Sequence, residues 1–162
     1  MKAVIDDGKN DIGKIIKKPL RLEIYPDSRV LRQVACPVEV FDNDIQLLAG
    51  MMLDFMRQNN GIGLAAPQIG LSRRIIVIEL DNQSYCMVNP KISLASDCDV
   101  MEEGCLSLPG KTVKVKRHKI AQIQGQDVTG KIQSIVAVGL LARAFQHETD
   151  HLNGVLICDY ES

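Results

Sequence analysis

The stretch GLLARAFQHETDHLNG, residues 139–154, carries the most informative pattern in the chain. Helix-forming residues fill it, and Gly154 at its end is suited to cap a helix. His147 and His151 lie four residues apart, so on a helix their side chains emerge from one face. Two imidazoles at this spacing can bind one metal ion at roughly 2.1 Å each. We therefore predict a helix over residues 139–153 that carries a metal site.

Glu148 directly follows the first of these histidines and completes the pattern H-E-x-x-H. In this position a carboxylate is poorly directed for metal binding, but it can lie beside water that the metal activates. There it can serve as a general base and then as a general acid. A bound divalent ion would lower the pKa of water from about 15.7 towards 7 and polarise a carbonyl oxygen. Two histidines can also share a helix face by chance, and against that alternative the motif favours a metal-dependent hydrolase.

The rest of the chain predicts one more long helix and a set of short strands. Residues 43–58 place apolar side chains at intervals of three and four, a pattern that indicates a helix with one face packed in the core. Turn-forming residues separate the strand-like segments, which are residues 73–80, 85–89, 91–95, 112–116, 120–124 and 131–138. The turns fall at residues 81–82, 89–90, 109–110 and 127–130. We predict an α+β fold, with mostly antiparallel strands surrounding the late helix that carries the H-E-x-x-H motif.

The domain organisation follows from length and local composition. Residues 1–21 are rich in polar turn formers and precede the regular patterns, so we predict a flexible N-terminal arm, or one that is loosely docked on the domain. Residues 22–162 then form a single catalytic metallohydrolase domain, long enough to bury its own core.

Composition and charge exclude several classes of protein. Apolar residues make up 46% and charged residues 24% of the chain, which is typical of a globular domain. A net charge of −1 and the absence of a basic stripe argue against nucleic acid as a partner. The apolar runs are far shorter than the ~20 residues of a membrane span. Five cysteines without regular spacing indicate a reducing compartment and no disulfide framework.

A catalytic metal site commonly has three protein ligands, and the third is missing from the helix itself. Downstream, Ile157 stands where one class of zinc protease has its third histidine, and Glu161 is the sole glutamate left. The third ligand is therefore expected upstream. Candidates there are Cys86, Cys98, Cys105, His118 and several carboxylates.

Cys105 is the favoured candidate among them. It lies in EGCLSLPG, residues 103–110, which glycine and proline mark as a tight segment outside any regular strand. Taken alone, Cys105 fits an ordinary buried cysteine; beside an incomplete pair of histidines, the ligand interpretation prevails. His118 stands between two basic residues and fits a solvated side chain better.

Residues 61–70, GIGLAAPQIG, form a small apolar loop. It is neither a dinucleotide nor a phosphate loop. Small residues permit close approach of a peptide-like substrate, and Gln68 could donate an amide N–H to a developing oxyanion. A plain structural turn is the alternative.

Taken together, three segments resemble the peptide deformylase family: GIGLAAPQ at residues 61–68, EGCLS at residues 103–107 and QHETDH at residues 146–151. The resemblance covers about residues 22–160. It implies an α+β fold and hydrolytic removal of the formyl group from N-formylmethionyl peptides and nascent chains, with release of formate.

The resemblance also implies roles for individual residues. Cys105, His147 and His151 would bind the metal, and Glu148 would be the general acid and base. Gln68 and the backbone N–H of Leu106 would stabilise the oxyanion. The metal implied is Fe²⁺, with Zn²⁺, Ni²⁺ or Co²⁺ as substitutes. Substrate binding would involve the backbone around Ile62 and Gly63, which would pair with an extended peptide, and a methionine pocket bordered by Ile62, Glu103, Leu140 and Arg143.

Three features depart from the family pattern. Thr112 stands near a position where the family usually has Arg or Tyr to anchor the substrate. The chain ends at Ser162, where bacterial members often continue into a helix that can contact the ribosome, and residues 1–21 are longer than the usual start. The family resemblance still makes the ribosome a candidate partner, and the bacterial cytoplasm is the expected location ahead of an organelle. The alternatives are a zinc endopeptidase built on the same helix and a silent relative that binds formylated peptide ends.

Overall fold

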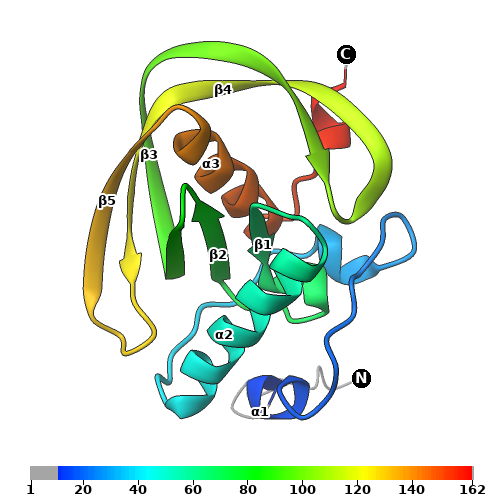
Figure 1. The fold of residues 1–162 in the computed structure, drawn as a ribbon, viewed down its shortest axis with the longest axis vertical. Coiled ribbons are helices and arrows are strands. Elements are labelled where there is room, and N and C mark those ends of the chain that lie inside the picture. Colours follow the sequence, from blue (N-terminus) through cyan, green and yellow to red (C-terminus); the bar gives the residue numbers. More distant parts are fainter. Residues whose placement is uncertain (1–10, 162) are drawn as a thin grey trace, which may run out of the picture.

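A curved antiparallel sheet with helices on both sides forms the protein. The computed structural model describes residues 11–161, apart from the side chains of residues 95 and 96. Within them, five strands pair in the order β1-β2-β3-β4-β5. They are β1 Gly63–Ala65, β2 Ile75–Leu80, β3 Gln83–Cys105, β4 Leu108–Gln126 and β5 Ile132–Val138. The helices are α1 Asp11–Ile15, α2 Asn43–Gln58 and α3 Leu140–Leu152, with 3-10 turns η1 Arg29–Arg32, η2 Ala66–Ile69 and η3 Ile157–Tyr160. Figure 1 shows β3 and β4 arching over α3, and the predicted α+β class is confirmed.

The two long helices pack on opposite faces of β2. Ile76 and Ile78 join the core cluster that contains Phe145 of α3. Ile75 and Val77 belong to the cluster that contains the apolar stripe of α2. Because side chains alternate between the faces of a strand, both sets are buried and the strand is apolar throughout. This packing holds α3 against the concave side of the sheet.

Both long helices match the sequence prediction. α2 begins after Asp42, whose side chain accepts a hydrogen bond from the backbone N–H of Asp44 at 3.0 Å and so caps the helix. The predicted range for the late helix, residues 139–153, contains α3 with one flanking residue at each end. Gly154 has φ +73°, a left-handed conformation that glycine adopts without strain.

The prediction of many short strands was wrong for β3 and β4, which are continuous. The expected turn at residues 89–90 is a register shift within β3. Asn89 has φ +51° there, and its side chain bonds both the N–H and the C=O of Val38. A residue in this conformation looks like a turn in sequence, whereas here it bends the strand without ending it.

Two further local predictions need correction. Cys105 is the last residue of β3, paired with Leu108 across a tight hairpin, so it does lie in a strand, and residues 109–110 belong to β4. The loop predicted at residues 61–70 contains strand β1 and the 3-10 turn η2. A strand as short as β1 forms only because β2 offers it a partner, which local sequence does not reveal.

Residues 11–21 of the predicted arm pack on the domain, and residues 1–10 lie outside the described part. Arg73 donates to the Asp11 carboxylate at 2.8 Å, and Ile12 and Ile15 contact the α2 core cluster. No helix in the described residues is long and apolar enough to cross a membrane.

Candidate metal centre

Helix α3 presents both histidines of the motif to one point beneath the β3–β4 hairpin. The rings of His147 and His151 lie 5.1 Å apart between centroids. His151 is 1% exposed, and burial lowers the pKa of its imidazole well below the usual value, which keeps this side chain neutral and able to ligate.

Cys105 reaches the same point from the end of β3. Its Sγ lies 3.4 Å from Nε2 of His151. One ligand atom from each of Cys105, His147 and His151 lies within 4.8 Å of the others. The three residues that sequence reasoning selected as metal ligands are therefore brought together by the fold. Among the described residues they form the only such group, and His118 is not part of it.

A buried carboxylate stands directly behind His147. Glu103 is 7% exposed, and its Oε2 lies 2.8 Å from Nδ1 of His147. Arg117 donates to both carboxylate oxygens at 3.0 Å, and Arg143 donates to Oε1 at 2.7 Å. Burial alone would raise the pKa of Glu103, but hydrogen bonds from His147 and Arg117 lower it to about 2. Glu103 is thus an anion that can only accept, so Nδ1 of His147 carries hydrogen and, in the neutral ring, Nε2 keeps its lone pair for a metal.

Glu103 and Arg143 were predicted to border the methionine pocket. Both do line the cavity, but their carboxylate and guanidinium also bond each other, and Arg143 pairs with Asp99 as well. The structure adds to each residue an electrostatic contact that the sequence did not indicate.

Glu148 is buried beside the three ligand atoms and is crowded by β1. It is 4% exposed, and its Oε2 has no hydrogen-bond partner among the described residues. Burial raises the pKa of its carboxyl to about 7. A Cβ on Gly63 would lie 2.4 Å from Oε1 of Glu148, so glycine is what allows this strand to approach the carboxylate.

Gln68, in the 3-10 turn η2, lies next to Cys105. Its Oε1 accepts from the N–H of Ala65 at 2.9 Å, which fixes the amide orientation. Its Nε2 donates to Oγ of Ser107 at 3.2 Å and lies 3.6 Å from Sγ of Cys105. The fixed amide places its Nε2 beside the predicted metal ligand Cys105, and the N–H that faces Sγ makes the weaker of its two hydrogen bonds.

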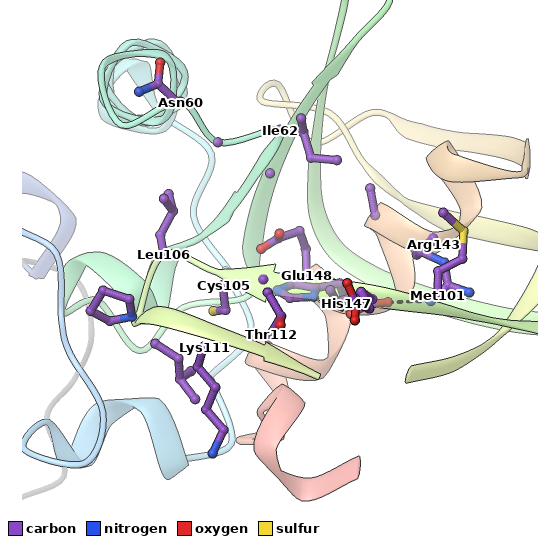
Figure 2. Close-up of a pocket in the computed structure, with 18 of the residues that line it drawn as sticks. Asn60, Ile62, Met101, Cys105, Leu106, Lys111, Thr112, Arg143, His147 and Glu148 are labelled. Carbon is purple, nitrogen blue, oxygen red and sulfur yellow. Dashed lines mark hydrogen bonds and ion pairs between the residues drawn. The ribbon is translucent and has the colours of Figure 1, made fainter. Parts of the chain in front are cut away.

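One open cavity of about 660 Å³ is lined by Cys105, His147, Glu103, Glu148 and Gln68. Figure 2 shows Cys105, His147 and Glu148 gathered on one side of it, with Ile62 and Met101 at its border. The predicted substrate-binding residues Ile62, Gly63 and Leu140 line it too. So do Thr112 and Leu106, whose backbone N–H was predicted to stabilise the oxyanion.

Sequence reasoning missed three polar residues behind the site: Arg117, Asp150 and Tyr160. Arg117 is 4% exposed and bonds Asp150 as well as Glu103. The alternation of β4 carried a signal for it, since Arg117 continues the inward series of Val113 and Val115.

The donor set fits a divalent cation. A thiolate and two imidazoles around one point match the ligands of Zn²⁺ and related metals, with room for a fourth ligand on the cavity side. Although burial lowers the pKa of His147, hydrogen bonds to Cys105 and Glu103 raise it to about 10, so the site favours positive charge. The unpartnered Oε2 of Glu148 points to a further polar ligand beside the three donors, because buried carboxylate oxygens are normally hydrogen-bonded.

Comparison with known proteins yields consistent matches over nearly the whole chain. The sequence model of polypeptide deformylase matches residues 19–162. A peptide deformylase of Thermodesulfovibrio yellowstonii is 44% identical over 145 residues, covering 86% of this chain and 87% of the relative. One of Rhizobium meliloti is 46% identical, covering 87% and 84%. Among solved structures, a peptide deformylase from Synechococcus elongatus in complex with actinonin superposes with a TM-score of 0.85 at 45% identity, covering 90% of this chain and 80% of that one. The Thermotoga maritima peptide deformylase gives 0.84 at 39% identity, with 88% and 97% covered.

Proposed function

This chain belongs to the polypeptide deformylase family, and from that premise we propose how its residues remove the N-formyl group from the formylmethionine of nascent peptides. It is a metal-dependent hydrolase, and the reaction breaks the formyl C–N bond to give formate and a free amine. The observation that carries the assignment of residues is the convergence of Cys105, His147 and His151 on one point beside a buried, unpartnered Glu148.

Cys105, His147 and His151 would hold the metal, and Fe²⁺ is our proposal for the native ion. When bound, the ion supplies Lewis acidity, which lowers the pKa of water and polarises a carbonyl oxygen. Glu103 holds the imidazole of His147 by its Nδ1, so that Nε2 is directed at the same point as Sγ of Cys105.

Glu148 is proposed as the group that moves protons. Its carboxylate would take a proton from the attacking water and deliver it to the leaving amine as the C–N bond breaks. A carboxyl with a pKa raised by burial to about 7 is suited to both steps near neutral pH. The amide N–H of Gln68 and the backbone N–H of Leu106 would donate to the oxyanion that develops on the formyl oxygen.

Substrate binding would use strand β1 as a template. Among the described residues β1 stands at an edge of the sheet and pairs with β2 alone, and Ile62 and Gly63 line the cavity. An extended peptide could add to this edge by backbone hydrogen bonds. The methionine side chain would then enter the space bordered by Ile62, Leu140 and the stem of Arg143, together with the neighbouring Glu103.

The test is formate release from formyl-Met-Ala-Ser by anaerobically purified protein, with bound metal quantified. We expect formate in proportion to bound metal and no cleavage of internal peptide bonds. Glu148→Ala should retain the metal and lose turnover. A metal-loaded protein that releases no formate contradicts the function, and unchanged turnover in Glu148→Ala contradicts the role of this carboxylate.

Two broader expectations remain proposals. Nascent chains as substrates suggest contact with the ribosome, which cosedimentation with ribosomes would test. The bacterial cytoplasm fits the five cysteines, all of which are free thiols.

A further inference from the structure

Tyr160, in the C-terminal turn η3, closes the far end of the charged network behind His147. Its hydroxyl donates to Oδ2 of Asp150 at 2.7 Å and accepts from Nη1 of Arg117 at 3.1 Å. Its ring lies over the guanidinium, 4.9 Å from ring centroid to Cζ. Tyr160 is 37% exposed whereas Arg117 is 4% exposed, so the ring forms the boundary between the buried guanidinium and solvent.

From this hydroxyl, two residues lead to the predicted metal ligand. Arg117 uses Nη1 for Asp150 and Tyr160, and its Nε and Nη2 for the two oxygens of Glu103. Glu103 in turn accepts from Nδ1 of His147. The hydrogen bonds on this path join charged or strongly polar groups, and the two from Arg117 to Glu103 are buried, where such bonds are strongest.

The geometry of the guanidinium makes this path stiff. Its donors lie in one plane, so a tilt at Nη1 also moves Nε and Nη2. Asp150 and Tyr160 hold the Nη1 end, and they come from α3 and η3, respectively. Without the hydroxyl, Asp150 loses a donor and Nη1 keeps a single acceptor. We expect the carboxylate of Glu103, which Arg143 also holds through Oε1, to shift with the guanidinium, and the ring of His147 to shift with the carboxylate.

We propose that Tyr160 is a positioning residue for the metal centre, acting on His147 through Arg117 and Glu103. This inference rests on the proposed function, because it assumes that His147 is a metal ligand. In this proposal η3 does more than attach the C-terminal segment to the domain. Its tyrosine hydroxyl sets the direction from which the imidazole of His147 meets the metal.

The experiment compares Tyr160→Phe with the parent protein after both are loaded with Co²⁺. The variant keeps the ring over Arg117 and removes only the hydroxyl. Carboxylates that orient a ligating histidine are worth about 10- to 100-fold in activity or affinity, and we expect about three- to tenfold for a residue two steps beyond that carboxylate. The loss should fall on kcat with KM unchanged, accompanied by a changed cobalt d–d absorption spectrum and faster cobalt loss to EDTA.

Tyr25→Phe is the matched control. The Tyr25 ring lies over Arg32 at 4.8 Å, and Arg32 pairs with Asp159 of the same turn η3. This second tyrosine–arginine pair contacts the same segment without leading to His147. We expect its kcat, cobalt spectrum and cobalt loss to match those of the parent protein.

A double variant tests the path itself. If Tyr160 acts through Glu103, then in a Glu103→Gln background the change Tyr160→Phe should alter kcat by less than twofold, because the intermediate link is already weakened. A full additive loss in the double variant refutes the path. A parental kcat and cobalt spectrum in Tyr160→Phe refute the proposal too, and so does a fall in thermal stability as its sole effect.

The cobalt readouts keep this proposal separable from the function. If the parent protein binds cobalt but releases no formate, the proposed function fails, while the spectrum and the rate of cobalt loss still report on Tyr160. If formate is released normally and Tyr160→Phe matches the parent in all three readouts, the positioning role alone fails.

Discussion

The contact between Gly63 and Glu148 allows the catalytic proposal to be tested by adding one methyl group. A Cβ on Gly63 would lie 2.4 Å from Oε1, 2.8 Å from Cδ and 2.9 Å from Cγ of Glu148. Ordinary van der Waals contact begins near 3.4 Å, so the carboxylate must retreat by about 1 Å. A displacement of about 1 Å at a catalytic group can cost about 100-fold in rate. We therefore expect Gly63→Ala to lower kcat for formate release by about 100-fold.

The metal ligands and the overall stability should be affected far less. Cys105, His147 and His151 are absent from the three nearest contacts of that Cβ, so the bound metal per chain should stay at the parental value. Overpacking a buried position costs roughly 1–3 kcal/mol, which thermal unfolding would record. Gly63→Ala thus separates loss of chemistry from loss of metal.

Gly50→Ala is the matched control for this substitution. A Cβ on Gly50 meets nothing within 4 Å, and Gly50 lies inside helix α2. Alanine there should leave turnover unchanged and stabilise the protein by about 0.5–1 kcal/mol. A Gly63→Ala protein with parental kcat would show that Glu148 tolerates displacement, and the proposed role of its carboxylate would then be untenable.

Three further predictions concern the metal, acid stability and the bend in β3. Cys105→Ser should weaken metal binding, and metal content equal to the parent after dialysis would exclude the thiolate as a ligand. Because the pKa of His147 is raised to about 10 without metal, metal binding to the parent protein should release protons at pH 7, which a titration in weak buffer would measure. For the same reason the affinity for metal should fall as the pH is lowered. The pKa of Glu103 is lowered from 4.5 to about 2, so above pH 4.5 its carboxylate contributes about 3 kcal/mol of stability, which is lost as the pH falls towards 2. The free energy of unfolding of metal-free Glu103→Gln, measured with denaturant, should therefore vary less with pH in that window than that of the parent. An unchanged pH profile would contradict the network. Asn89→Ala removes three side-chain hydrogen bonds, two of them to Val38, at a residue with φ +51°. We expect it to lower the free energy of unfolding by roughly 2–4 kcal/mol and to leave the metal content unchanged. A loss below about 1 kcal/mol would mean that the bend in β3 does not depend on this side chain.

Much of the fold was predictable wherever a pattern is local. The interval of three and four residues identified α2, and the run that ends at Gly154 identified α3. The strands were harder, because turn-like residues such as Asn89 occur within continuous strands and bend them. Strand β1 was missed because three residues form a strand only when a partner is already in place.

Local sequence is enough to specify the core chemistry of the site. Two histidines four residues apart share a helix face whatever the rest of the chain does, and Glu148 follows from the same local geometry. The selection of Cys105 needed elimination of other ligands and the resemblance to a family, since nothing local connects residue 105 to residue 147.

What surrounds those residues depends on the tertiary structure. Behind His147, side chains from β3, β4 and η3 meet: Glu103, Arg117 and Tyr160. In β1, the absence of a side chain at Gly63 leaves room for Glu148. Such contacts join residues 14 to 44 positions apart in the hydrogen-bonded network. They depend on how strands cross a helix, and that geometry is set by packing of the whole core rather than by any one segment.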